Sequence, residues 1–136
     1  MARARITKEE LSEKNLHFFA LSIETKNAIL VLISEDEDQF GTVAASVPSL
    51  DPMQIKTSLS SILLGYRNST VARMLAERLA KKSGKIGLVS VYLQNVSEVE
   101  ATPTIIKIFE KVTMPRSEAQ NVEGREGTSY EPTQLS

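Results

Sequence analysis

Residues 16–33 read LHFFALSIETKNAILVLI, and this stretch decides the class of fold. In residues 16–24 and in residues 27–33, large apolar side chains occupy both odd and even positions. A strand with this pattern is expected to be covered, at least in part, on both faces. The polar Thr-Lys-Asn sequence between the two segments is typical of a turn. The stretch therefore predicts an antiparallel hairpin.

Three further segments are predicted to extend the sheet. Residues 40–47 (FGTVAASV) follow an acidic loop at residues 34–39, and Gly41 marks a bulge or a close approach of backbones. Residues 55–64 are a weaker candidate, because serines alternate there with aliphatic side chains. Residues 86–93 (IGLVSVYL) are again apolar at both parities.

The clearest helix lies between residues 68 and 84. Asn68 or Ser69 can cap its first amides, Lys81 and Lys82 lie in its last turn, and Gly84 can end it. Its predicted buried stripe recurs at i, i+3, i+4 and i+8, and consists of Val71, Met74, Leu75 and Leu79.

A second helix is expected to begin at Thr102 and Pro103, because a hydroxyl cap followed by proline is a typical helix start. Pro115 helps to end it. Its predicted buried face consists of Ile105, Ile108, Phe109 and Val112.

The predicted fold class is α+β, with a mostly antiparallel sheet and two helices on one face. We expect residues 1–15 to form a flexible N-terminal arm or a short helix, residues 16–114 to form the domain, and residues 115–136 to form a disordered polar tail. Two short helices can cover only one face of such a sheet. A β-sandwich-like, sheet-to-sheet dimer would cover the other face, because large exposed apolar patches are uncommon on monomers. The alternative is that both parities fill a single, well-wrapped core.

Composition excludes several classes of function. The chain has 136 residues, which is the size of one domain, and 41% of them are hydrophobic. The formal net charge of −1 does not favour binding to nucleic acid or anionic membranes. The chain has no cysteine, and no apolar run long enough to span a membrane, so we expect a protein of the cytoplasm, the nucleus or both. Arg3 and Arg5 do not indicate a targeting peptide, because acidic residues follow at once.

The search for catalytic chemistry yields no assignment. His17 lies in an apolar strand, where a packed or surface histidine is commoner than a catalytic base. The run of four carboxylates at residues 35–38 lacks the ligand spacing and turn glycine of a calcium loop, so it is interpreted as a solvated loop. A basic cluster near residues 73–85 has few aromatic neighbours, which argues against nucleic-acid binding. No catalytic, cofactor or metal residue is predicted.

Three segments together carry a family resemblance. They are Leu63-Leu64-Gly65 at the end of KTSLSSILLG, LAERLAKK at residues 75–82, and Tyr92-Leu93-Gln94-Asn95. In this order they resemble the proteasome assembly chaperone 4 family. The resemblance implies a non-enzymatic protein that pairs through its sheet with a related partner, proteasome assembly chaperone 3. It further implies that the pair binds proteasome alpha subunits and guides alpha-ring assembly of the core particle.

The contact surface for such a client is chosen by elimination, since apolar faces are committed to core and dimer. The remaining polar candidates are Tyr66, Arg67, Asn68, Lys81, Lys82, Asp36, Glu37 and Asp38. Arg67 is the leading single candidate, because arginine beside tyrosine is a common interface pairing, although a solvated turn residue explains it equally well. The alternative function is a roadblock- or longin-like dimeric scaffold in trafficking or GTPase regulation.

Overall fold

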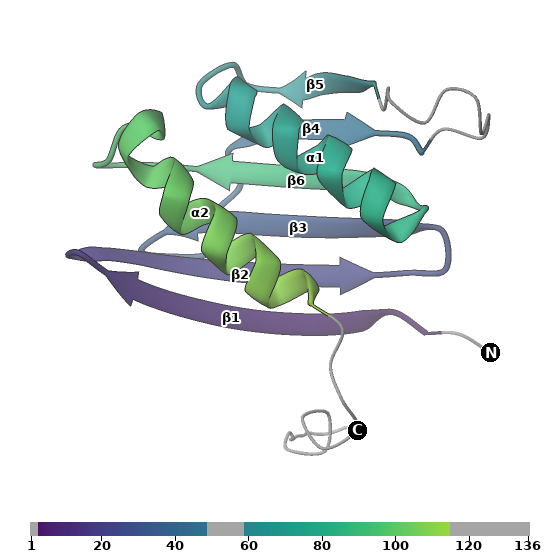
Figure 1. Cartoon of the computed structure of the whole chain (residues 1–136), viewed down its shortest axis with the longest axis horizontal. Coiled ribbons are helices and arrows are strands. Elements are labelled where there is room, and N and C mark those ends of the chain that lie inside the picture. The colour runs from purple at the N-terminus through teal and green to yellow at the C-terminus, as the bar shows by residue number, and fades with distance from the viewer. Residues whose placement is uncertain (1–2, 49–58, 115–136) are drawn as a thin grey trace.

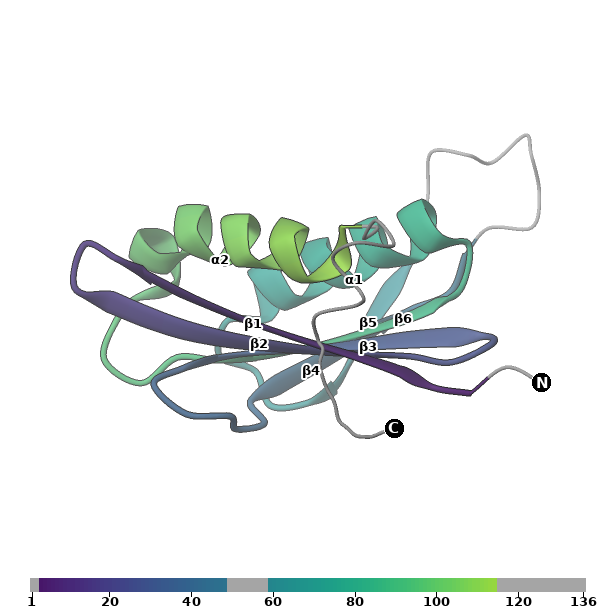
Figure 2. The same ribbon diagram turned by 90° about the horizontal axis from the view of Figure 1, so that it is seen from below.

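The computed structural model describes residues 3–48 and 59–114, which form one sheet and two helices (Figure 1). The elements in chain order are β1 (Arg5–Glu13), β2 (Leu16–Glu24), β3 (Ala28–Glu35), β4 (Thr42–Ser46), β5 (Ser60–Leu64), α1 (Ser69–Ser83), β6 (Ile86–Tyr92) and α2 (Glu98–Thr113). The sheet order is β1-β2-β3-β6-β4-β5, and only β3 and β6 are parallel. Both helices lie on the same face of the sheet (Figure 2). The predicted α+β class, the largely antiparallel sheet and the placement of the helices are confirmed.

The hairpin of β2 and β3 forms as the sequence predicts. Its register pairs Ala20 with Ile33 and Ser22 with Val31, so these four side chains share one face. The turn is closed by the amide of Thr25, which donates to the carbonyl of Ala28 at 2.8 Å.

The N-terminal residues are not a flexible arm or a short helix. β1 pairs with β2 along its whole length, from Arg5 opposite Glu24 to Glu13 opposite Leu16. The segment reads RITKEELSE, with too few apolar residues to indicate a strand. As an edge strand, β1 pairs with a single neighbour, the apolar β2. Its charged side chains protect the free edge against pairing with another chain. The prediction for this segment was therefore wrong because its pairing partner, rather than its own composition, fixes its conformation.

The first helix begins and ends where the sequence predicts, but its N-terminal cap is different. Asn68 adopts a left-handed conformation with φ of 61°, and its side chain does not cap the helix. Instead, the Glu98 carboxylate at the start of α2 accepts from the Val71 amide at 2.8 Å. Gly84 ends the helix in the left-handed conformation, as expected. The cap from α2 also links the starts of the two helices.

The second helix begins five residues earlier than predicted. Ser97 caps it by accepting from the amide of Glu100 at 3.2 Å, so Pro103 lies one turn inside α2. A proline there removes the hydrogen bond to the Val99 carbonyl. Val99 is 86% exposed, so solvent can compensate that carbonyl. The sequence Ser-Glu-Val-Glu carried a better capping signal than Thr102 and Pro103.

The core fills the space between the helices and the sheet. Both predicted stripes point into it, although Met74 of the α1 stripe is only partly buried. The largest completely enclosed side chains are Phe18, Phe109, Ile33, Leu75, Leu79, Ile105 and Ile108. The predicted tail at residues 115–136 lies outside the described residues.

Candidate protein-interaction surfaces

The sheet face opposite the helices is apolar. Alternation along the strands places one parity against the helices and the other parity on this opposite side. The second set, which we call the open face, is aligned by the register of the ladders. Its apolar members are Leu21, Ile23, Leu30, Leu32, Val43, Ala45, Ile86 and Leu88. Leu32 and Val43 are buried already in the monomer, Ile86 is exposed, and the other five are partly exposed. Among the described residues, no helix or strand covers this face (Figure 2).

The dimensions of the whole sheet give the approximate area of the side that carries the open face. Six strands spaced ~4.8 Å apart separate the two edges by ~24 Å. A strand of 7 residues, such as β6, adds ~23 Å in the other direction. Their product is ~550 Å² before the relief of the side chains is counted, compared with roughly 800 Å² per partner in a standard stable interface.

The single histidine lies on the β2 side of the open face. His17 contacts the Glu10 carboxylate through Nε2 at 2.7 Å, and its ring lies 4.7 Å from that of Phe19. These are contacts of a half-exposed side chain on a flat sheet surface. The arrangement fits the surface histidine considered from the sequence.

The predicted contact residues fall at two opposite ends of the domain. The link Tyr66–Asn68 and the acidic residues Asp36–Asp38 follow the C-terminal ends of β5 and β3, which lie at the same end of the sheet. Lys81 and Lys82 lie at the C-terminal end of α1, at the other end (Figure 1). A single compact surface cannot therefore contain all eight residues.

The link residues border a hollow of about 270 Å³, which we call the aromatic hollow. Phe40, Tyr66 and Tyr92 line it together with Arg67. The Phe40 and Tyr66 side chains are 63% and 83% exposed, so they contribute little to the core. The hollow thus gathers exposed aromatic side chains from three separate loops or strand ends.

Two glycines allow the backbones around the aromatic hollow to approach. A side chain at Gly41 would place its Cβ 2.1 Å from the carbonyl oxygen of Val91. Gly65 has a φ of +76°, and a Cβ there would lie 2.7 Å from Oγ1 of Thr42. That hydroxyl donates to the Arg67 carbonyl and holds the link against β4. The close approach predicted at Gly41 is confirmed.

The acidic run separates into one structural and three solvated carboxylates. Glu35 is 5% exposed, and its Oε1 accepts from the amides of Gln94 at 2.7 Å and Asn95 at 2.9 Å. Asp36, Glu37 and Asp38 are exposed and form what we call the acidic turn. Within residues 3–48 and 59–114, no cluster of His, Cys, Asp or Glu side chains has the arrangement of a metal site.

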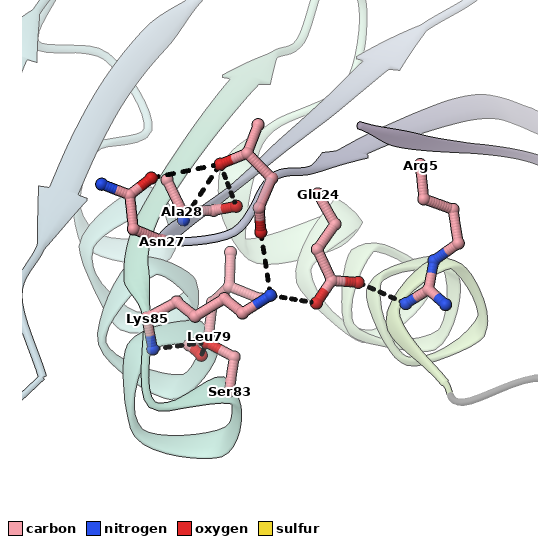
Figure 3. Close-up of polar contacts among 8 residues, drawn as sticks. Arg5, Glu24, Asn27, Ala28, Leu79, Ser83 and Lys85 are labelled. Carbon is pink, nitrogen blue, oxygen red and sulfur yellow. Dashed lines mark hydrogen bonds and ion pairs between the residues drawn. The ribbon is translucent and has the colours of Figure 1, made fainter. Parts of the chain in front are cut away.

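The basic C-terminal end of α1, which carries Lys81 and Lys82, already takes part in polar contacts. Lys82 pairs with Glu110 at 3.3 Å, whereas Lys81 is exposed. Nearby, Glu24 lies between Arg5 and Lys85, whose Nζ is 2.7 Å from its Oε2 (Figure 3). The hydrogen bond from Lys85, followed by that from Arg5, lowers the pKa of Glu24 despite the opposing effect of burial. These cations therefore act first in holding the domain together.

A second hollow of about 200 Å³ lies beside this charged cluster. Arg5, Glu24, Lys82 and Thr113 line it, close to the C-terminal ends of both helices. Its cations already face carboxylates of the same chain, so it offers no free charge to a ligand.

In the part of the chain that the structure describes, no helix is long and apolar enough to span a membrane.

Sequence reasoning missed Phe40 and Tyr92 as members of the surface. Phe40 was assigned to a strand, but β4 begins only at Thr42, and the preceding residues form the loop. Tyr92 is partly exposed at the end of β6, although a tyrosine within an apolar strand is usually a core side chain. The sequence did offer one signal for Phe40. It directly precedes Gly41, and a glycine that allows a close backbone contact also marks the end of a regular strand.

Comparisons with known proteins bear on the fold. No protein-family model matches the sequence, and no curated protein matches it. A solved structure, described as a novel chaperone complex for yeast 20S proteasome assembly, contains a chain with the same fold. The TM-score is 0.56, the match covers 78% of this chain and 91% of that chain, and the sequences are 11% identical. At this identity the likeness establishes the shared fold alone.

Proposed function

We propose that the chain is a proteasome assembly chaperone. In this proposal it pairs through its open face with a related chaperone of the proteasome assembly chaperone 3 type. The pair binds alpha subunits and promotes assembly of the alpha ring of the core particle, in the cytoplasm and nucleus. In this role the protein acts by binding, and no catalytic, cofactor or metal residue is assigned to it.

The observation that carries this proposal is the open face in a chain with this fold. A sheet with helices on one side and partly exposed aliphatic side chains on the other leaves that second side available to a partner, because contiguous apolar patches mark interaction sites. A second sheet of similar shape would bury Leu30, Leu88 and their neighbours. The likeness to a subunit of a proteasome assembly chaperone complex indicates which kind of protein would supply it.

The sequence resemblance supports the same proposal independently of the overall fold. Its three segments form the end of β5, most of α1 and the end of β6. The first and third segments border the aromatic hollow, through Gly65 and Tyr92. The resemblance therefore concerns adjacent surfaces as well as core positions.

Loss of the protein from cells should test the role in assembly. We expect incomplete or mis-ordered core particles to accumulate on native gels, most strongly under heat or proteotoxic stress. Reintroduced Val99→Glu protein, altered at an exposed position on α2, should restore assembly, whereas Leu88→Glu on the open face should not. Normal core particles in cells lacking the protein, under stress as well, would argue for the roadblock- or longin-like scaffold instead.

A further inference from the structure

The aromatic hollow combines exposed aromatic side chains with unpaired charge. Phe40 and Tyr66 are 63% and 83% exposed, and they line the same hollow although 26 positions separate them in the sequence. Such solvent-exposed side chains do not stabilise the core. Aromatic side chains in a depression are, however, the commonest energetic centres of protein interfaces.

Arg67 is the one charged residue in the lining of the aromatic hollow, and the acidic turn precedes that lining closely in the chain. The acidic turn ends at Asp38, two residues before Phe40. Its carboxylates form no ion pair with any residue of the described ranges, and neither does Arg67 in the lining of the hollow. The acidic turn and Arg67 together carry a net charge of −2 (−3 + 1), which attracts cationic groups and repels phosphate.

Size also restricts the occupant. The hollow measures about 270 Å³, below the range of about 300–1,000 Å³ typical of small-molecule sites. It can hold one large apolar side chain of a partner, with the flanking residues of that partner outside. An occupant that fits both size and charge has an apolar anchor next to basic residues.

We propose that the aromatic hollow is a docking site for an extended segment of a protein partner, in which a large apolar side chain lies beside lysine or arginine residues. The anchor enters between Phe40 and Tyr66, and the basic residues face the acidic turn. Arg67 disfavours basic residues on its own side, so it contributes orientation. This inference deepens the proposed function, because it rests on the chain acting by binding proteins, and it identifies the chemistry of a bound client.

A peptide titration tests the docking site with the full-length protein. The probe is fluorescein-labelled Gly-Lys-Lys-Leu-Phe-Lys-Lys-Gly, followed by fluorescence anisotropy and by amide chemical shifts. We expect binding that weakens with added salt, with shifts centred on Phe40, Tyr66 and Tyr92. The same peptide with glutamate for each lysine, or with Gly-Gly for Leu-Phe, should bind at least tenfold more weakly.

Variants of the protein locate the binding. Tyr66→Ala and Phe40→Ala should each weaken binding roughly tenfold. The triple variant Asp36→Asn, Glu37→Gln, Asp38→Asn should weaken it several-fold and remove most of the salt dependence. Leu59→Ala, which truncates a 78% exposed side chain directly before β5, is the matched apolar control, and Glu110→Gln is the charge control. Both controls should bind normally, and all variants should melt like the native protein.

Three results would overturn the docking site. They are no binding at about 1 mM peptide, equal binding of the glutamate peptide, and binding unaffected by Tyr66→Ala. The titration does not involve proteasome subunits, so it separates the two proposals. If the protein binds the peptide in the hollow but purifies without proteasome subunits, the docking site stands and the proposed function is wrong. If it purifies with proteasome subunits but does not bind the peptide, the proposed function stands and the docking site is wrong.

Discussion

Glu35 should be the most sensitive carboxylate of the acidic run. It is 5% exposed, and one of its oxygens accepts from two backbone amides, those of Gln94 and Asn95. Glu35→Ala leaves both donors without their partner, at a cost of roughly 1–3 kcal/mol for each. Gln94 and Asn95 are themselves exposed, so water can partly replace the lost acceptor. We therefore expect Glu35→Ala to lower the free energy of unfolding by about 2–4 kcal/mol.

Urea denaturation measures this loss, with Glu37→Ala as the matched control two residues away. Glu37 is exposed, and its substitution should change stability by less than about 0.5 kcal/mol. Glu35→Gln keeps an acceptor oxygen without its charge, and should fall between the two. Hydrogen exchange at the amides of Gln94 and Asn95 should accelerate in Glu35→Ala. Equal stability of Glu35→Ala and Glu37→Ala would refute the structural role assigned to Glu35.

Three further predictions concern the core, the polar cluster and the hollow. Leu75→Ala, at a completely buried position of α1, should cost about 2–5 kcal/mol in urea denaturation, and native-like stability would contradict the register of the helix. The pKa of Glu24 is lowered mainly by Lys85, so the contribution of Glu24 to stability is complete above pH ~4.5 and is lost as the pH falls through its lower pKa in the folded protein. Glu24→Gln should therefore reduce the fall of the melting temperature at acidic pH. An unchanged fall would contradict this assignment. Gly41→Ala should destabilise the protein, because its Cβ would overlap the carbonyl oxygen of Val91, and unchanged melting would show that this contact relaxes freely.

Hydrophobic periodicity predicted the elements whose pattern is local, which are the helix with an apolar stripe and the hairpin of two adjacent strands. The α1 stripe at Val71, Leu75 and Leu79 and the hairpin of β2 and β3 are local patterns, so the sequence around them determines the structure. β1 was missed because its strand conformation comes from pairing with β2, which its charged composition does not signal. The start of α2 was misplaced because Pro103 outweighed the capping signal at Ser97.

The candidate surface was predictable in its residues but not in its grouping. The link and the acidic turn were identified as polar segments, yet only the strand order brings them to one end of the sheet and leaves Lys81 at the other. Phe40 was not identified as exposed, since an aromatic residue in an apolar segment ordinarily indicates core. Long-range topology, which no local pattern encodes, decides such groupings.

The central claim is that the protein pairs through its open face and thereby acts in proteasome assembly. Its most direct test is affinity purification of the tagged native protein, Leu88→Glu and Val99→Glu from cells, followed by quantitative mass spectrometry. We predict that the native protein and Val99→Glu recover a related chaperone together with alpha subunits, and that Leu88→Glu loses both while melting normally. Recovery of no proteasome subunit by the native protein, even when incorporation of beta subunits is stalled, would contradict the account.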